Sequence, residues 1–332
     1  MASTDRIILA LDAGGTATRC MLATSEGEIM GFGVGGPANH ILRGWDTARE
    51  SITTAVDAAL KTGRDASTNI AIAIASSAGI GPDGEGREVI EALLAELVPQ
   101  AAIVRATGDM VAAFWGALVT PIGVVVSAGT GSVCYGRNVT GVTCQVGGWG
   151  PIMGDEGSAY DIAVQALRAV ACASDGRGQP TILTTAVAEA LGGYSALDVA
   201  VQVYGKPLER EEIAALAVRV FGAAQQRDPV AIGILRRAGR ALGIAALAAL
   251  RNVGLLASPT SVSYSGSVFE AGAFVSDPFR EAIHDAAPLA KVEHPILPPI
   301  GGAYRLGLQT LGAFMDDAIT YRLASGLVKA GL

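Results

Sequence analysis

The stretch that decides the fold is IILALDAGGT, residues 7–16, an apolar run that ends in Asp12 and a Gly14-Gly15-Thr16 turn. A second apolar run follows directly after the turn. Two such runs around a glycine turn predict a β-hairpin. Glycines let the backbone approach a ligand closely, and successive N–H groups of a turn form a concave site that suits a phosphate. The stretch therefore predicts a phosphate-binding hairpin.

The same pattern occurs a second time in GVVVSAGTGS, residues 123–132, whose turn is Gly129-Thr130-Gly131. Either hairpin alone is explained equally well by an ordinary buried strand pair. Two copies, each with a threonine in the turn, indicate two phosphate-binding hairpins that grip one nucleotide.

The composition predicts a packed globular protein. Half of the 332 residues are apolar and only 17% are charged, and the length allows two domains. The net charge of −7 argues against a general nucleic-acid binder or a protein that binds membrane surfaces. We therefore expect the nucleotide to be held by backbone dipoles and a divalent cation rather than by a basic groove.

The cysteines and the apolar runs indicate the cellular compartment of the protein. The cysteines show no C-x-x-C spacing, and the histidines are too scattered for a zinc signature. We expect free thiols in a reducing compartment. The apolar run before Asp12 is too short for a secretion signal, and the Ala241–Leu250 stretch is about half of a membrane span. These features predict a soluble, cytoplasmic protein.

The first half of the chain follows the order β-β-β-α-β-α-β-α, which is typical of an actin-like or ribonuclease-H-like domain, and the order restarts at Gly123. Pro121 and Gly123 interrupt the helical pattern, so we expect an α/β protein with domains 1–119 and 120–332 around an interdomain cleft. In the first half the expected strands are Ile7–Leu11, Arg19–Ala23, Glu28–Gly33, Asn69–Ala75 and Ala102–Thr107, and the expected helices are Trp45–Lys61, Arg87–Leu97 and Val111–Val119, with a turn-rich Gly79–Gly86 segment. The second half is expected to hold strands to about Gln145, a helix Ser158–Ala171, a helical series from Pro180 to Arg251, a strand Ser261–Ser265 and helices Asp277–Ala287 and Gly302–Phe314.

Two acidic residues are candidates for the chemistry. The sequence lacks a P-loop and a dinucleotide-binding glycine motif, so another phosphate site is needed. Asp12, at the end of a strand before the phosphate turn, can orient hydrated Mg²⁺, although aspartate also favours turns in general. Asp109 follows a strand at the N-cap of a helix, where it either caps the helix or accepts the proton of a sugar hydroxyl during phosphoryl transfer.

The loop Gly147–Ser158 carries glycines, Trp149, Asp155 and Glu156 just before a helix. The two acids could merely complement the helix dipole. The loop also suits sugar recognition, because acids accept hydrogen bonds from hydroxyls and an aromatic ring covers the sugar. Two later turns, 263–268 and 298–303, are either ordinary connections or an adenosine slot that contains Gly266, Ser267 and Gly302.

Together these segments resemble the N-acetylglucosamine kinase branch of the BadF/BadG/BcrA/BcrD ATPase family, within the sugar-kinase/Hsp70/actin superfamily. The matching segments stand in family order and span nearly the whole chain; they are DAGGT (12–16), GPANH (36–40), GD (108–109), SAGTGS (127–132), GWG (148–150), MGDEGS (153–158), AQQRDP (224–229), GSV (266–268) and GGA (301–303).

The resemblance implies an ATP-dependent sugar kinase in which Asn39, Asp109, Gly148, Trp149 and Asp155 bind the sugar and Asp109 is the base. It also implies ATP contacts from Thr16, Thr130 and Ala224 and an Mg²⁺ ion near Asp12. We expect the neighbouring glycines Gly14, Gly15, Gly129 and Gly131 to contact the phosphates. A homodimer that binds an amino sugar and ATP, without nucleic acid or membrane, is the expected assembly.

The expected reaction is phosphorylation of N-acetylglucosamine at C6, with glucosamine and N-acetylmuramic acid as open alternatives. Ser76–Ile80 lacks a Gly-Gly-Asp that some members carry, and Ile41 stands where some carry an aromatic residue. An alternative of another class is an ATPase that activates a radical dehydratase through an Fe–S cluster. That function needs a cysteine before the second phosphate turn, where this chain has Val126-Ser127-Ala128. A nucleotide-switched binding protein without chemistry is a third interpretation, which Asp109 and the Trp149 loop disfavour.

Overall fold

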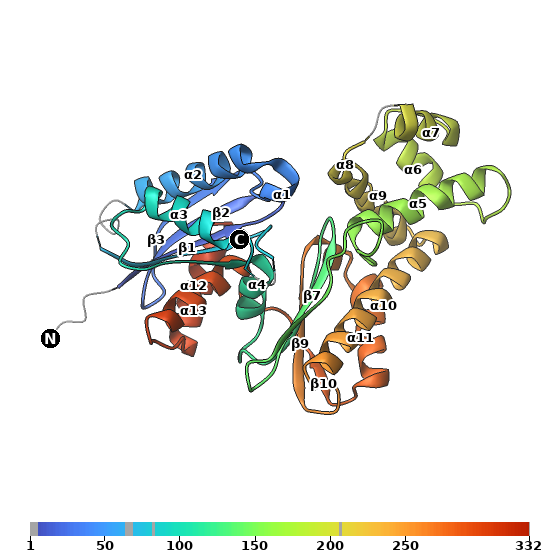
Figure 1. The fold of residues 1–332 in the computed structure, drawn as a ribbon. Coiled ribbons are helices and arrows are strands. Elements are labelled where there is room, and N and C mark those ends of the chain that lie inside the picture. Colours follow the sequence, from blue (N-terminus) through green and yellow to red (C-terminus); the bar gives the residue numbers. More distant parts are fainter. Residues whose placement is uncertain (1–5, 64–68, 82–83, 206–207, 332) are drawn as a thin grey trace. The chain divides into compact units, whose positions relative to one another are not determined.

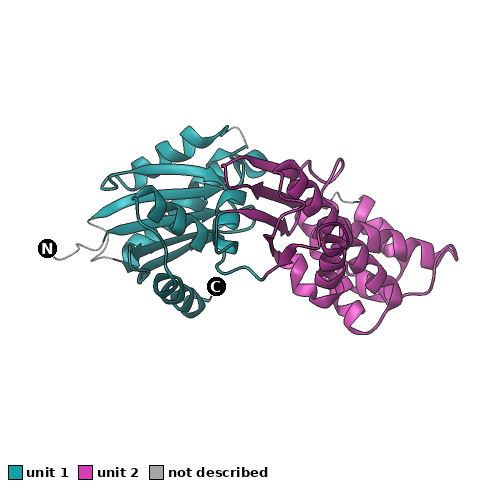
Figure 2. Cartoon of the chain, turned by 90° about the horizontal axis from the view of Figure 1, so that it is seen from below, with its two compact units in different colours: residues 1–121, 294–332 teal, residues 122–293 magenta. Residues whose placement is uncertain are grey.

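The computed structural model describes residues 6–63, 69–81, 84–205 and 208–331. The chain divides into unit 1, residues 1–121 and 294–332, and unit 2, residues 122–293 (Figure 2). Residues 82–83 of the expected turn and 206–207 of the expected helical series lie outside the described residues. The passage from unit 1 to unit 2 falls where Pro121 interrupts the helical pattern.

Unit 1 is built on a five-stranded sheet in the order β3-β2-β1-β4-β5 (Figure 1). The first three strands are antiparallel, whereas β1, β4 and β5 are parallel, so their carboxyl ends meet at one edge. The register there places Asp12 beside Ser76 and Ser76 beside Thr107. The strands are β1 (Ile7–Ala13), β2 (Thr18–Thr24), β3 (Ile29–Gly35), β4 (Ile70–Ser77) and β5 (Val104–Gly108).

Both faces of this sheet are covered, as the apolar pattern of β1 requires. Leu9 and Leu11 pack with the helices of one face, and Ile8 and Ala10 pack with those of the other, because successive side chains of a strand point to opposite faces. The first face carries α2 (Trp45–Thr62), which follows the short α1 (His40–Arg43), and α3 (Arg87–Leu97). The second carries α4 (Asp109–Ala117), α12 (Pro299–Thr310) and α13 (Asp317–Lys329).

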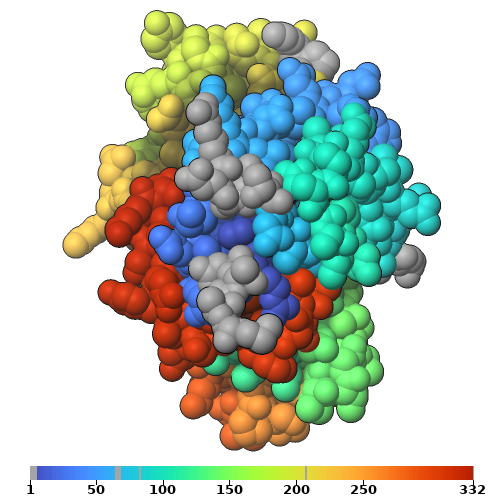
Figure 3. All heavy atoms as spheres, turned by 90° about the vertical axis from the view of Figure 1, so that its left-hand side faces the viewer, coloured from blue at the N-terminus to red at the C-terminus, as the bar shows by residue number. Residues whose placement is uncertain are grey.

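The C-terminal segment belongs to unit 1, whereas the sequence analysis placed it in a second domain of residues 120–332. Tyr304 of α12 is fully buried, and its hydroxyl donates to the Thr24 carbonyl at 2.7 Å. C-terminal residues accordingly lie beside N-terminal ones on one face of the molecule, red beside blue in Figure 3. The physical reason is burial: Ile8 and Ala10 need cover, and α12 and α13 supply most of it.

Unit 2 repeats the same sheet topology, with the order β10-β9-β6-β7-β8. Again three strands form an antiparallel meander, and the first of them pairs in parallel with β9. The strands are β6 (Gly123–Ala128), β7 (Ser132–Arg137), β8 (Thr143–Gly147), β9 (Thr260–Ser265) and β10 (Ala290–Val292). The prediction of two α/β halves with one strand order is therefore confirmed.

Unit 2 differs from unit 1 in a long helical insertion between β8 and β9 (Figure 1). Its core joins Val124 and Val126 of β6 to Ile234 and Leu242 of the long helix α10. That helix begins where Asp228 caps it, with Pro229 in the first turn. The helices are α5 (Ala159–Ser174), α6 (Leu183–Ala190), α7 (Ala196–Gly205), α8 (Arg210–Ala215), α9 (Ala217–Gln225), α10 (Pro229–Asn252), the 3₁₀ helix η1 (Ser267–Ala271) and α11 (Ala273–Ala286).

Candidate functional site

Asp12 is a buried carboxylate next to the first phosphate turn. It is the last but one residue of β1 and is 7% exposed. The described residues provide one oppositely charged partner, the Arg19 guanidinium, at 4.0 Å. Burial and the negative charge of Asp109 raise the pKa of Asp12 to about 7, and the charge of Arg19 opposes this shift. A second positive charge at this position would stabilise the ionised carboxylate, so the surroundings of Asp12 fit a divalent cation.

The first turn presents backbone donors. The Gly14 N–H donates to the Ala17 carbonyl at 3.0 Å, which closes the turn. Within the described part of the chain, the N–H groups of Gly15 and Thr16 have no acceptor. A Cβ added to Gly15 would meet no atom within 4 Å. The turn therefore offers two adjacent N–H groups and open space, as a phosphate site requires.

The loop that carries Asn39 is fastened to this turn. The Ala38 N–H donates to the Gly14 carbonyl at 3.0 Å, and the Thr18 hydroxyl donates to the Gly36 carbonyl at 2.8 Å. The Asn39 side chain caps α1, because its Oδ1 accepts from the N–H of Ile41 at 3.1 Å and of Leu42 at 3.3 Å. Its amide NH₂ group can still donate, so capping and sugar binding are compatible.

His40 is a residue whose role the sequence analysis did not predict. Its ring stacks on Trp45 with 3.8 Å between centroids, and its atoms would lie 2.8 Å from a Cβ added to Gly79. Its Nδ1 is buried and has no partner among the described residues. Burial lowers the pKa of His40, while the charge of Glu85 opposes the shift. The ring thus packs the Asn39 loop against the turn after β4.

Asp109 is the first residue of α4 and Gly108 is its N-cap, so the helix begins earlier than predicted and its cap lies one residue before Asp109. Its Oδ1 accepts from the Met110 N–H at 2.8 Å. Desolvation raises the pKa of Asp109 despite this hydrogen bond. The Ser76 hydroxyl donates to the Gly108 carbonyl at 3.3 Å, which joins the ends of β4 and β5. Since the charge of Asp109 also acts on Asp12, the structure brings these two predicted site residues together.

The second phosphate turn, in unit 2, is shorter but also presents backbone donors. The Gly129 N–H donates to the Gly131 carbonyl at 2.9 Å. Among the described residues, the N–H groups of Thr130 and Gly131 lack an acceptor, and a Cβ on Gly129 would meet nothing within 4 Å. Gly266, with φ 98°, packs directly against Ala128, and Ser267 is exposed beside it. Gly266 and Ser267 therefore lie at the predicted place, next to the second turn.

The loop Gly147–Ser158, here called the acidic loop, is hydrogen-bonded to the residue that follows this turn through Asp155. Its Oδ1 accepts from the Ser132 N–H at 3.1 Å, and its Oδ2 accepts from the Arg210 guanidinium. Asp155 is 3% exposed and has φ 60°, a left-handed conformation that side chains rarely adopt. The Gly148 N–H donates to the Ser132 carbonyl at 3.0 Å, whereas Trp149 is largely exposed. Gly148, Trp149 and Asp155 are thus part of one loop anchored at Ser132.

Two residues predicted to contact ATP are buried within their units. Ala224 is fully buried in the core of unit 2, near the end of α9. Gly302 lies in unit 1 rather than in the second domain, and a Cβ there would come within 1.8 Å of the Ala112 carbonyl oxygen. The glycine is needed for the close packing of α12 on α4. We therefore leave both residues out of the nucleotide site.

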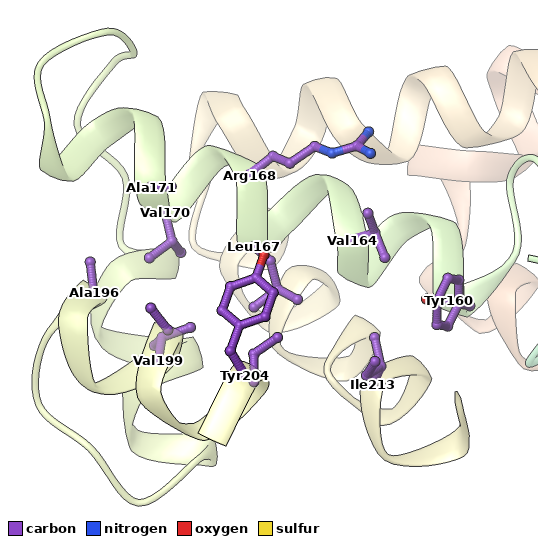
Figure 4. A pocket seen from close by; sticks show the side chains of 12 residues that line it. Tyr160, Val164, Leu167, Arg168, Val170, Ala171, Ala196, Val199, Tyr204 and Ile213 are labelled. Atoms are coloured by element: carbon purple, nitrogen blue, oxygen red, sulfur yellow. The ribbon is translucent and has the colours of Figure 1, made fainter. Parts of the chain in front are cut away.

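A cavity of about 460 Å³ lies in unit 2, and none of the predicted site residues lines it (Figure 4). Its lining is mainly apolar and comes from α5, α7 and α8. Tyr160 lies at one end of the cavity, and Ala196 and Val199 lie at the other (Figure 4). The described residues contain no group of three or more histidine, cysteine or acidic side chains that could hold a metal ion by themselves. None of the helices that the structure describes combines the length and apolar character needed to cross a membrane.

Each unit therefore gathers its predicted residues at one edge of its own sheet. In unit 1 these are Asp12, Gly14, Gly15, Thr16, Asn39 and Asp109, and in unit 2 they are Gly129, Thr130, Gly131, Gly148, Trp149, Asp155, Gly266 and Ser267. In both units the segment of the phosphate turn is hydrogen-bonded to the loop that carries the amino acids predicted to bind the sugar. Arg210 joins this set in unit 2, and no local motif marks it in the sequence.

Curated relatives of this chain are kinases of amino sugars. An N-acetylmuramic acid/N-acetylglucosamine kinase of Clostridium acetobutylicum is 28% identical over 289 residues, which cover 86% of this chain and 93% of the relative. An N-acetyl-D-glucosamine kinase of Dictyostelium discoideum is 27% identical over 314 residues, which cover 92% of this chain and 98% of the relative.

A solved structure shares the fold. A candidate N-acetylglucosamine kinase from Chromobacterium violaceum matches with a TM-score of 0.70 and 24% identity, over 91% of this chain and 98% of that chain. The model of one protein family matches residues 9–304 and thus both units. The chain belongs to the BadF/BadG/BcrA/BcrD ATPase family.

Proposed function

We propose that this protein is an ATP-dependent sugar kinase that phosphorylates an amino sugar, with N-acetylglucosamine ranked first and C6 as the acceptor position. The observation that carries the proposal is the buried Asp12 and the partly exposed Asp109, beside a turn in which two N–H groups have no acceptor among the described residues. One carboxylate at a phosphate turn and a second one nearby are what phosphoryl transfer to a hydroxyl requires. The amino-sugar kinases among the relatives support the choice of substrate class.

In the proposed reaction the two phosphate turns bind the β- and γ-phosphates through the N–H groups of Gly15, Thr16, Thr130 and Gly131. Gly266 and Ser267, beside the second turn, would border the adenosine. Catalysis of phosphoryl transfer depends mainly on positioning and on stabilisation of charge, which preorganised N–H groups supply.

Asp109 is proposed as the base. Its side chain is partly accessible at the start of α4, and its raised pKa shows that the desolvated carboxyl favours the protonated form. A carboxylate in such surroundings accepts a proton more readily than one in water. It would align the sugar hydroxyl and take its proton as the phosphoryl group is transferred.

Asp12 would hold Mg²⁺ through water, together with phosphate oxygens of the nucleotide. Mg²⁺ prefers one or two carboxylates and nucleotide oxygens to a cage of protein ligands. The bound ion would neutralise charge on the phosphates during transfer. Asn39, Gly148, Trp149 and Asp155 would bind the sugar, with the Trp149 ring over its face.

The acetamido group is the reason for ranking N-acetylglucosamine above glucosamine. Asn39 and the backbone of the Gly148-Trp149 loop are neutral, so they suit a neutral substituent better than a buried ammonium. Ser76 and Ser77 are fully buried, and the Ser76 hydroxyl donates to the Gly108 carbonyl, so we do not assign these two side chains to the sugar.

The alternative of a radical-dehydratase activator is not favoured. An Fe–S cluster needs thiolate ligands. Residues 126–128 contain no cysteine, and Cys20 and Cys134 are buried within their units. The free thiols are also consistent with a cytoplasmic location, which we propose together with a homodimer as the assembly.

A coupled assay of ADP release tests the proposal, with Mg-ATP and N-acetylglucosamine, glucosamine or N-acetylmuramic acid as acceptor. We expect sugar-dependent ADP release and a 6-phosphate product, identified by mass spectrometry and NMR. If glucosamine is preferred by tenfold in kcat/KM, about 1.4 kcal/mol of transition-state binding, the acetamido assignment is wrong. ADP release that no sugar stimulates, from a brown and iron-containing protein, would favour the dehydratase activator instead.

A further inference from the structure

Asp155 connects the two parts of the site that unit 2 contributes. Its Oδ1 binds the Ser132 N–H, directly after the phosphate turn, and its backbone carbonyl accepts from the Ser158 N–H at 3.0 Å, at the start of α5. The Ala159 N–H donates to the Gly129 carbonyl at 2.8 Å. The acidic loop and the phosphate turn are therefore one hydrogen-bonded structure, with the Asp155 carboxylate at its centre.

Arg210 reaches this centre from a helix 55 residues away in sequence. Its guanidinium donates to Oδ2 of Asp155, and its side chain is 25% exposed. A Cβ added to Gly131 would lie 2.5 Å from the Arg210 guanidinium and 3.0 Å from the Asp155 carboxylate. The ion pair is thus packed against the backbone of the phosphate turn.

The position of Arg210 is set by the fold. It is the first residue of α8, and a capping box between Glu209 and Glu212 defines where this helix begins. The packing of α8 on α5 brings the side chain to the acidic loop, and Ile213 of the same helix lines the neighbouring cavity with Tyr160 of α5 (Figure 4).

We propose that Arg210 is a positioning residue, which holds the Asp155 carboxylate in the orientation that receives the acceptor sugar. This inference rests on the proposed function, because it assigns Arg210 to the acceptor side of a sugar kinase. An ionised carboxylate offers about four lone-pair sites, and Ser132 and Arg210 each occupy one. In this proposal the two remaining sites accept hydrogen bonds from two hydroxyl groups of the sugar.

The charge of Arg210 matters as much as its geometry. Asp155 is almost fully buried, and a buried carboxylate that loses its cationic partner becomes costly to keep ionised. Without Arg210, the carboxylate would lose the contact that fixes its orientation, and it would no longer accept two hydroxyl hydrogen bonds. Arg210 donates to Asp155 and not to the N–H groups of the phosphate turn, so we expect nucleotide affinity to be preserved.

The test compares Arg210→Met and Arg210→Lys with a control, Arg219→Met, which changes an exposed arginine of α9. For Arg210→Met we expect kcat/KM for N-acetylglucosamine to fall by about 10²-fold or more, whereas the Kd for ATP changes by less than about threefold. Arg210→Lys should recover part of the loss, because it keeps the charge but not the planar fork. The control should match the wild-type protein.

A chemical rescue separates positioning from a structural role. In Arg210→Ala, guanidinium chloride at concentrations below the denaturing range should restore part of the sugar-dependent rate, because the ion can occupy the vacated place beside Asp155. The double variant Asp155→Asn/Arg210→Met should lose little more than Asp155→Asn alone, as expected for residues that act as a pair.

Three results would overturn the inference. They are an unchanged KM and kcat for the sugar in Arg210→Met, a loss confined to ATP affinity, and additive losses in the double variant. A wild-type protein that phosphorylates no amino sugar overturns the proposed function itself, and the inference falls with it. If Arg210→Met does not fold, the same comparison of kcat/KM for the sugar with the Kd for ATP is made on Arg210→Lys.

Discussion

The negative charge of the partly exposed Asp109 acts on the buried Asp12 and, together with burial, raises the pKa of Asp12 to about 7. The sheet explains their proximity, since Asp12 ends β1 and Asp109 follows β5, with the end of β4 between them. Two neighbouring acidic groups with little compensating charge lower the stability of the folded, ligand-free protein. They suit a site that a cation and a phosphorylated ligand complete.

The first prediction concerns the stability of the ligand-free protein. The pKa of Asp12 rises from 3.8 to about 7 on folding, so between these values the folded state retains a proton that the unfolded state has lost. Stability therefore falls as the pH rises from about 4 to about 7. Asp12→Asn removes this penalty, and its melting temperature should exceed that of the wild-type protein at pH 8.

The measurement is thermal unfolding of both proteins between pH 5 and 8, in EDTA and without nucleotide. The difference in melting temperature between Asp12→Asn and the wild-type protein should become smaller toward low pH. A gap that stays constant with pH would show that Asp12 is ionised throughout this range. With Mg-ATP present, the wild-type protein should have the higher melting temperature, because the variant has lost its proposed metal ligand.

The second prediction is that Asp109→Asn abolishes sugar phosphorylation and largely preserves ATP affinity. The amide cannot accept the hydroxyl proton, and loss of a positioned base costs on the order of 10²-fold or more in kcat. Rates come from the coupled assay and ATP affinity from calorimetry. Near-normal turnover in Asp109→Asn would remove this residue from the mechanism.

The third prediction uses glycines at which the protein leaves room for an added methyl group. A Cβ on Gly15 or Gly129 meets no protein atom within 4 Å, so Gly15→Ala and Gly129→Ala should fold normally. If the turns bind phosphates, each methyl group obstructs the ligand, and ATP affinity should fall by about tenfold or more.

The matched control for these variants is Gly222→Ala in α9, where a Cβ also meets nothing within 4 Å. It should leave ATP binding unchanged. Gly131→Val is a less selective probe, because its side chain would also displace the Asp155–Arg210 pair and weaken sugar binding. Normal ATP affinity in Gly129→Ala would exclude the second turn as a phosphate site.

The fourth prediction concerns Arg305, which connects α12 to the end of α4. Its guanidinium donates to the carbonyls of Trp115, at 3.0 Å, and of Leu118 and Val119, and lies 5.4 Å from the Trp115 ring centroid. Arg305→Met leaves these carbonyls without their donor, so we expect the free energy of unfolding to fall by about 2–4 kcal/mol. Urea unfolding, followed by circular dichroism, measures the loss. The exposed Arg322→Met in α13 is the control, and an equal loss in both variants would mean that the contacts of Arg305 contribute nothing specific.

Much of the fold could be predicted because its signals are local. The continuous apolar runs and the glycine turns predict both hairpins, and α3 spans Arg87–Leu97 as expected. The helix α13 was not predicted, and neither was the short strand β10. The apolar residues of α13 join a core that includes strands formed almost 300 residues earlier in the chain.

The sequence by itself determined the two glycine turns, the acidic residues at the ends of strands and the repeated order of elements, since each depends on residues that are neighbours in the chain. Tertiary structure alone decided that α12 and α13 return to unit 1, that Ala224 and Gly302 are buried, and that Arg210 meets Asp155. The reason is that burial and charge pairing join residues that are far apart in sequence, and no local pattern records which surface a helix will cover or which carboxylate an arginine will reach.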